Sequence, residues 1–148
     1  LDAHPDWGNN AQLGLRLGWV ADQRFGEQNL GFAGAASFAG AQALADHVAQ
    51  TLGRAVTLVQ PDDRPVRRVA WCSGGAQSYF EAAIAAGVDA FITGEISEPQ
   101  AHLARETGVA FIAAGHHATE RYGAPALVAQ VAQQHGLSHV FIEIDNPA

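Results

Sequence analysis

Residues 66–93 decide the fold; they read VRRVAWCSGGAQSYFEAAIAAGVDAFIT. The β-branched and apolar residues over 66–72 predict a strand, and the apolar run over 88–93 predicts a buried strand. Between them, residues 76–87 predict a helix that is entered through a glycine-rich turn at 73–75. A strand, a helix and a second strand joined by short turns are typical of a parallel pair with a right-handed crossover.

The alternation continues to the end of the chain. We expect a short helix from Glu98 to Thr107, a strand over 108–114, a long helix from Thr119 to Gln134 and a last strand over 138–144. Repeated strand–helix units imply an α/β fold whose sheet contains parallel strands. Binding sites in such sheets form at the carboxyl ends of the strands, so the residues that follow each strand are the first to consider for chemistry.

Upstream of the central segment the pattern is less regular. Residues 40–52 place apolar side chains on one face, which predicts a helix. Residues 9–17 predict a two-turn helix capped by Asn9 or Asn10, although their alternation also fits a strand. The remaining expectations are a loop over 22–30, a short strand within 30–38 and a strand over 55–59.

The composition indicates a folded protein, since 48% of the 148 residues are hydrophobic and 16% are charged. The formal net charge of −7 disfavours nucleic acid as a partner, because an acidic surface repels phosphate backbones. No apolar run approaches the roughly 20 residues that cross a bilayer, so we expect no membrane span. The single cysteine, Cys72, excludes an internal disulfide and suits the cytoplasm. Because the chain contains no methionine, even at position 1, we expect that an N-terminal portion of the protein precedes Leu1.

The segment GHHATER, residues 115–121, is the strongest candidate site. It follows a predicted strand, and His116 and Glu120 are four residues apart, so one helical turn brings imidazole and carboxylate to the same side. Nitrogen and oxygen ligands of this kind suit zinc, manganese, iron or nickel. The alternative is structural: Glu120 favours a helix N-terminus, Thr119 caps the helix, and the histidines fill a turn.

A second cluster, LDAHPD, opens the chain. Asp2, His4 and Asp6 alternate, so on an extended segment they share one face. A carboxylate in this position can bridge two metal ions. The alternative is a polar loop ahead of a helix.

Two other strand ends carry polar residues. Glu95 follows a buried strand, and its carboxylate can orient a metal-bound histidine, take up a proton, or only begin the next helix. The turn 73–75 resembles a phosphate-binding turn, because glycine N–H groups precede a helix, yet it lacks the lysine of a P-loop and the spacing of G-x-G-x-x-G. Cys72 has no sequence feature of a nucleophile, and a buried, inert thiol is expected.

Three long segments occur in a fixed order: LDAHPDWGNNAQLG, RRVAWCSGGAQSYFEAAIAAGVDAFITGEISE and AAGHHATERYGAPAL. With them the chain closely resembles the GTP cyclohydrolase I type 2-like family over essentially its whole length. The resemblance implies two interlinked α/β domains with mixed or parallel sheets, the first of which is incomplete in this chain. It makes residues 1–29 the tail of the first domain, 30–114 the second domain, and 115–148 a segment that returns to the first.

The resemblance also implies a dinuclear metal site on the inner surface of a ring-shaped homohexamer. The family holds its metals with a His-His pair from the N-terminal region, the Asp of LDAHP, and the His and Glu of GHHATE. The last three match Asp2, His116 and Glu120 of this chain, and Asp2 would bridge the ions. The His-His pair has no counterpart here, so we expect two divalent ions (zinc, iron, manganese or nickel) per full-length chain and reduced occupancy in residues 1–148.

For function, the resemblance implies a metal-dependent hydrolase of a nucleotide or related small molecule, similar to GTP cyclohydrolase. Opening the imidazole ring of GTP requires an activated water and a base, for which Glu95 and His117 are the candidates. The alternative is a non-enzymatic, metal-binding ring that acts as a scaffold or regulatory interaction protein.

Overall fold

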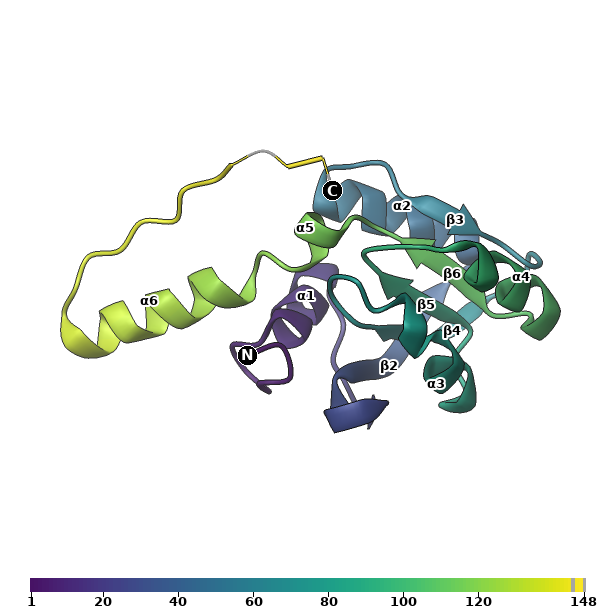
Figure 1. Cartoon of the computed structure of the whole chain (residues 1–148), viewed down its shortest axis with the longest axis horizontal. Helices are drawn as coiled ribbons and strands as arrows, with labels where there is room; N and C mark the ends of the chain where they lie inside the picture. Colours follow the sequence, from purple (N-terminus) through teal and green to yellow (C-terminus); the bar gives the residue numbers. More distant parts are fainter. Residues whose placement is uncertain (145, 148) are drawn as a thin grey trace.

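The computed structural model describes residues 1–144, 146 and 147. These residues contain a six-stranded sheet with the strand order β1-β2-β4-β5-β6-β3 (Figure 1). The strands are β1 Gln23–Phe25, β2 Gly31–Phe38, β3 Thr57–Val59, β4 Val66–Trp71, β5 Ala90–Thr93 and β6 Ala110–Ala113. The helices are α1 Asn9–Leu17, α2 Ala41–Leu52, α3 Phe80–Ala85, α4 Glu98–Thr107, α5 His116–Thr119 and α6 Gly123–His135, with short 3-10 turns η1 Glu27–Asn29 and η2 Gln77–Tyr79.

The centre of the sheet is parallel. β4 pairs with β5 and β5 pairs with β6 in parallel, and the connections between them run through α3 and α4. The outer pairs, β1–β2, β2–β4 and β3–β6, are antiparallel. The predicted α/β fold with a mixed sheet is therefore confirmed, whereas the division into two interlinked domains stays a prediction.

Hydrophobic side chains fill both faces of the sheet, since successive residues of a strand point to opposite faces. On one face, Leu13 of α1 and Leu44 of α2 are fully buried against the strands. On the other, Phe80 of α3 and Ala104 of α4 close a second core. The helices thus cover both faces of the sheet and leave its carboxyl edge as the place where polar residues collect. None of the helices in the described ranges is long and apolar enough to cross a bilayer.

The N-terminal region differs from the sequence prediction in two details. Residues 9–17 form α1 as predicted, but the helix begins after Gly8 without a side-chain cap, because Asn9 and Asn10 bond to distant segments instead. The expected loop over 22–30 contains β1 and η1. β1 forms because β2 pairs with it in antiparallel register, and no local pattern reveals that partner.

The long helix expected from Thr119 to Gln134 is wrong at its start. α5 ends at Thr119, Glu120 leaves helical geometry with φ −115° and ψ 23°, and α6 begins at Gly123. The N–H of Gly123 donates to Asn9 Oδ1 at 2.6 Å, and a Cβ at position 123 would lie 2.7 Å from the same oxygen. α6 thus begins in direct contact with α1, and the break leaves α5 as a separate turn of helix.

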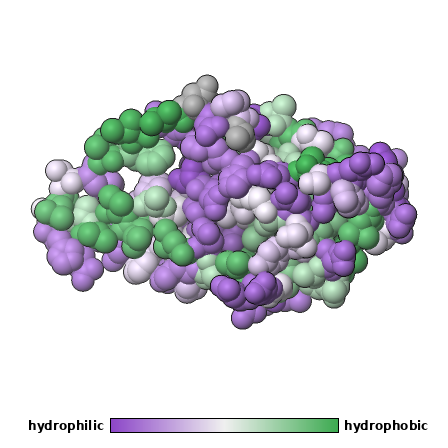
Figure 2. Space-filling model, viewed as in Figure 1, coloured by the Kyte–Doolittle hydropathy of each residue, from purple (hydrophilic) through white to green (hydrophobic). Residues whose placement is uncertain are grey.

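The prediction of a last strand over 138–144 is also wrong. These residues, which we call the C-terminal segment, are exposed and form no strand. They run from the end of α6 back toward α2 (Figure 1), and Figure 2 shows hydrophobic residues gathered along this segment and α6. A strand needs a hydrogen-bonded neighbour, and no described strand pairs with the C-terminal segment.

Candidate functional site

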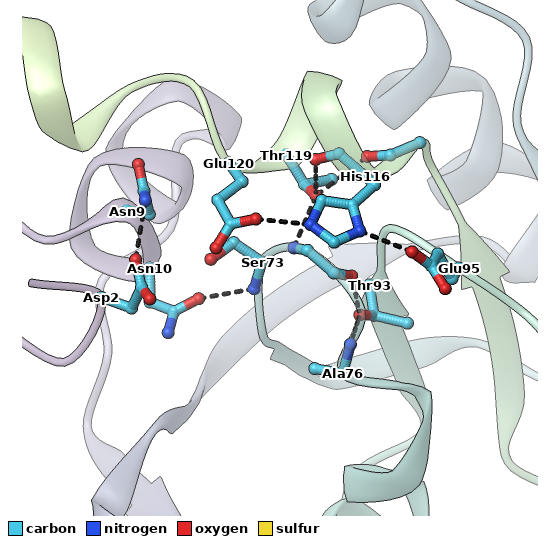
Figure 3. Close-up of polar contacts among 12 residues, drawn as sticks. Asp2, Asn9, Asn10, Ser73, Ala76, Thr93, Glu95, His116, Thr119 and Glu120 are labelled. Atoms are coloured by element: carbon cyan, nitrogen blue, oxygen red, sulfur yellow. Dashed lines mark hydrogen bonds and ion pairs between the residues drawn. The ribbon is translucent and has the colours of Figure 1, made fainter. Parts of the chain in front are cut away.

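Three chain segments meet at the carboxyl edge of the parallel strands. They follow β4, β5 and β6, and backbone bonds tie them together: Gly94 N donates to Gly74 O at 2.9 Å, and Gly115 N donates to Gly94 O at 2.9 Å. These bonds continue the parallel ladder past the strand ends. The arrangement brings Glu95 and His116, from neighbouring segments, to one place (Figure 3).

His116 lies between two carboxylates. Its Nδ1 is 2.5 Å from Glu95 Oε1, and its Nε2 is 2.7 Å from Glu120 Oε2. The hydrogen bond to Glu95, with the charge of Glu120, raises the pKa of His116 above its ordinary 6.5, although partial burial opposes this. The same bond lowers the pKa of Glu95. The pair predicted from the spacing of GHHATER therefore forms, and Glu95 contacts the other ring nitrogen of His116.

The position of Glu120 also corrects the structural alternative. Glu120 follows the last residue of α5, Thr119, and caps the C-terminal end of that helix. A carboxylate is disfavoured at a helix C-terminus, because the helix dipole places partial negative charge there. A helix-dipole role therefore does not explain this glutamate, whereas its contact with His116 does.

Gly74 provides the space for the pair. Its φ of +68° lies in the left-handed region, and a Cβ built on it would lie 2.5 Å from Glu120 Oε2 and 3.1 Å from His116 Nε2. Real Cβ atoms do not approach the nearer of these atoms so closely. The glycine-rich turn after β4 thus has a role that the sequence did not show, which is to let imidazole and carboxylate approach the backbone.

The same turn is not arranged to cradle a phosphate. Its backbone N–H groups donate to side-chain oxygens: Ser73 to Asn10 Oδ1 at 2.6 Å, Gly74 to Thr119 Oγ1 at 2.9 Å and Ala76 to Thr93 Oγ1 at 3.2 Å. The three acceptor residues, Asn10, Thr93 and Thr119, are fully buried. They fix the turn, and nothing in their local sequence distinguishes them from ordinary core-facing polar residues.

The LDAHPD cluster does not lie extended. Residues 2–7 form turns, and Nδ1 of His4 accepts hydrogen bonds from the backbone of Asp6 and Trp7, which directs this histidine into its own loop. Asp2 is half-buried, and its Oδ1 accepts a hydrogen bond from Asn9 at 2.7 Å. The shared face expected for the three residues is therefore wrong, while Asp2 alone is held against α1.

The thiol of Cys72 is buried and lies within range of the charges of Asp2 and Glu120. Burial raises the pKa of its thiol to about 12, and the negative charges of both carboxylates add to this rise. The side chain is 5% exposed. The expected inert thiol agrees with this environment, because a thiol is unreactive unless it ionises.

His117 belongs to different surroundings from His116. Its Nε2 lies 4.0 Å from Glu143 Oε1 in the C-terminal segment and has no hydrogen-bond partner among the described residues. The two neighbouring histidines therefore face separate partners.

The His116–Glu120 pair fits part of a metal site. Metal–ligand distances of about 2.0–2.2 Å place two ligands of a tetrahedral ion roughly 3.4 Å apart, so a small rotation of Glu120 would admit an ion between Oε2 and Nε2. Glu95 already occupies the position of a carboxylate that orients a ligating histidine. Within the described residues, however, no three His, Cys, Asp or Glu side chains converge as a complete set. A full site needs ligands in addition to these two.

Comparison with known proteins places these features in a family. A family model described as Duf34/NIF3 (NGG1p interacting factor 3) matches residues 1–147. A "GTP cyclohydrolase 1 type 2 homolog" of Neisseria meningitidis serogroup A is 54% identical over 149 residues, which cover 100% of this chain and 60% of that protein. Two solved structures are also similar. Protein ybgI, titled as of unknown function, has a TM-score of 0.93 at 45% identity and is covered over 60% of its length. TTHA1606 of Thermus thermophilus has a TM-score of 0.85 at 28% identity, with 99% of this chain and 59% of that one covered.

Proposed function

Since this chain belongs to the Duf34/NIF3 family, we propose that the whole protein is a dinuclear metal-binding protein that hydrolyses a nucleotide or a related small molecule. The observation that carries the proposal is the His116–Glu120 pair, held at the carboxyl edge of the sheet by Glu95. Nitrogen and carboxylate donors in this combination suit zinc, iron, manganese or nickel. In this proposal Asp2 bridges the two ions. The chain spans about 60% of the length of the curated relatives it matches, and under this proposal the remaining ligands would come from outside it.

The residues of this chain would support the chemistry in distinct ways. A dinuclear centre, when bound, lowers the pKa of a coordinated water and polarises the bond to be cleaved. Glu95 holds the imidazole of His116 through Nδ1, which would leave Nε2 as the ring nitrogen that binds an ion. This contact favours a positioning role for Glu95 over that of the base. His117 remains the other candidate base, although in this structure it faces the C-terminal segment.

We further propose that the whole protein is a cytoplasmic homo-oligomer, with six copies as the family resemblance implies. The net charge of −7 supports a small-molecule ligand rather than nucleic acid. Sedimentation equilibrium of the full-length protein measures the number of copies directly, and a monomer would contradict the ring.

The experiment that tests the function combines elemental analysis with a panel of nucleotides. We expect about two ions per full-length chain, and fewer ions, bound more weakly, in residues 1–148. We also expect hydrolysis of at least one nucleotide, which stops when the metal is removed. Equal, tight stoichiometry in both chains would show that the ligand set is wrong. Full metal content without hydrolysis of any nucleotide would instead favour the non-enzymatic scaffold.

A further inference from the structure

The GHHATER segment carries a second pair of side chains that the metal-site proposal does not use. His117 and Arg121 are four residues apart, as are His116 and Glu120. His116 and Glu120 face Gly74, whereas His117 and Arg121 both lie against Glu143 of the C-terminal segment. One short stretch of chain thus presents an acid–imidazole pair in one direction and a basic pair in another.

The basic pair lines a pocket. Its volume is about 350 Å³, and it is formed by residues 52–55 at the end of α2 and just beyond it, by His117, Ala118 and Arg121, and by Asn146 and Pro147. Arg54 crosses this space: a Cβ added at Gly115 would collide with its guanidinium, so this group lies directly against the start of α5. Its Nη2 donates to the Pro147 carbonyl at 3.1 Å. The volume is in the range of small-ligand pockets.

The charge of the pocket contrasts with that of the chain. The sequence has eight arginines and no lysine against fifteen acidic residues, yet two of the eight arginines line this one pocket. Arg68 pairs with Asp22 on the folded body, whereas Arg121 pairs with Glu143, on the exposed C-terminal segment. The two carboxylate oxygens of Glu143 already lie near Arg121 and His117, one near each, and the C-terminal segment that supplies them is exposed.

From this arrangement we propose that the Arg54–His117–Arg121 pocket binds a phosphate-type oxyanion, and that the Glu143 carboxylate takes the place of this anion when no ligand is bound. Guanidinium groups match phosphate oxygens by paired N–H donors, which makes arginine well suited to such a site. His117, which lines the pocket, directly follows the candidate metal ligand His116 in the sequence. The inference rests on the proposed function in one respect only: it takes the anion to be the phosphate group of the nucleotide that the metal site would hydrolyse.

Titration of the metal-loaded, full-length protein with inorganic phosphate, followed by calorimetry, tests the pocket. Arg121→Gln and Arg54→Gln should each weaken phosphate binding at least about tenfold with unchanged metal content, since a charged hydrogen bond contributes roughly 1.5–3 kcal/mol. Arg105→Gln, on the exposed surface of α4, is the matched control and should bind as the parent does. Thermal unfolding of each variant checks that the fold is intact.

Glu143→Gln tests whether the Glu143 carboxylate competes with the anion or only attaches the C-terminal segment to Arg121. If Glu143 competes with the anion, its neutralisation should tighten phosphate binding several-fold. Unchanged affinity in Glu143→Gln, or in both arginine variants, would overturn the proposal, and the second result would place the phosphate on the metal. If the full-length protein binds no metal ion but still loses phosphate binding in Arg121→Gln, the metal function is rejected and the pocket is kept.

Comparing a nucleotide with its nucleoside tests whether the pocket holds the phosphate of the substrate. A nucleoside monophosphate should bind more tightly than the matching nucleoside, and Arg121→Gln should remove most of that preference. If the preference survives in both arginine variants, the pocket does not hold the nucleotide phosphate, and that part of the proposal fails.

Discussion

Gly74 lies so close to Glu120 that a Cβ on the glycine would be 2.5 Å from the Oε2 atom of the glutamate. The two residues are far apart in the sequence, and the contact exists because the turn after β4 and the end of α5 meet at one edge of the sheet (Figure 3). A backbone position thus sets where the carboxylate can lie, and with it the distance to His116.

Gly74→Ala should reduce metal binding by moving Glu120 away from His116. The new methyl group also meets a positive φ, which costs about 1–2 kcal/mol for a residue with a Cβ. Gly87→Ala is the matched control, because its φ is +77° and an added Cβ there meets nothing within 4 Å. Elemental analysis and urea unfolding of both variants should show similar destabilisation but loss of metal only for Gly74→Ala. Equal metal content would show that the close contact is not part of the site.

The state of His116 should depend on pH in a defined direction. Its folded-state pKa is raised above 6.5, so in the metal-free protein its contribution to stability is fully present below pH 6.5 and is lost as the pH rises through the raised pKa. Metal binding, which needs the neutral ring, should strengthen over the same rise. Glu95→Gln should lower the His116 pKa, as measured by NMR titration, and weaken metal binding by about 10–100-fold. Glu98→Gln, beside the exposed His102, should leave His116 unchanged.

Glu120→Gln should weaken metal binding and leave the fold intact, since the side chain reaches into the site and not into the core. Its contact with His116 is 2.7 Å long and partly exposed, so loss of the contact in the metal-free protein should change the free energy of unfolding by no more than about 1 kcal/mol. Metal content and urea unfolding are the two measurements. Unchanged metal content would return Glu120 to a structural role.

Asp2→Ala in the full-length protein should lower the occupancy of both metal positions at once. A bridging carboxylate offsets the repulsion between two dications, whereas loss of a terminal ligand affects one ion. Anomalous scattering from metal-soaked crystals gives the two occupancies separately. Two peaks at full strength would reject the bridging role. Asp2 would then have only a structural role, as the acceptor of the hydrogen bond from Asn9.

Asn10→Ala should destabilise the fold, because Asn10 is fully buried and bonds to two segments. Its Oδ1 accepts from Ser73 N at 2.6 Å, and its Nδ2 donates to Leu30 O at 2.8 Å. A buried group left without its partner costs about 1–3 kcal/mol. Urea unfolding should show at least this loss, while Gln42→Ala, which removes an exposed bond to Asp46, should stay within about 0.5 kcal/mol. A small effect at Asn10 would mean that another donor replaces it.

The sequence predicted the parts of the fold that depend on local patterns. β4 and β6 follow from buried apolar runs, α4 matches the helix expected from Glu98 to Thr107, and the His116–Glu120 pair follows from a spacing of four. The break at Glu120 was signalled by Pro125, whose missing N–H and ring disfavour a helix that runs unbroken from Thr119, but the bond of Gly123 to Asn9, near the other end of the chain, was not predictable. The positioning role of Gly74 was hidden for the same reason: a glycine pair after a strand looks alike whether it turns the chain or makes room for a side chain.

The C-terminal segment has a consequence for how this chain behaves among its own copies. Its seven residues, SHVFIEI, contain no proline, one acidic residue and side chains that favour extended structure, and Val140, Phe141 and Ile142 are exposed. Unpaired backbone groups beside such side chains are a template for pairing with the same segment of another molecule. Residues 1–148 in isolation therefore carry an aggregation-prone stretch, and solutions of this chain should lose monomer as its concentration rises.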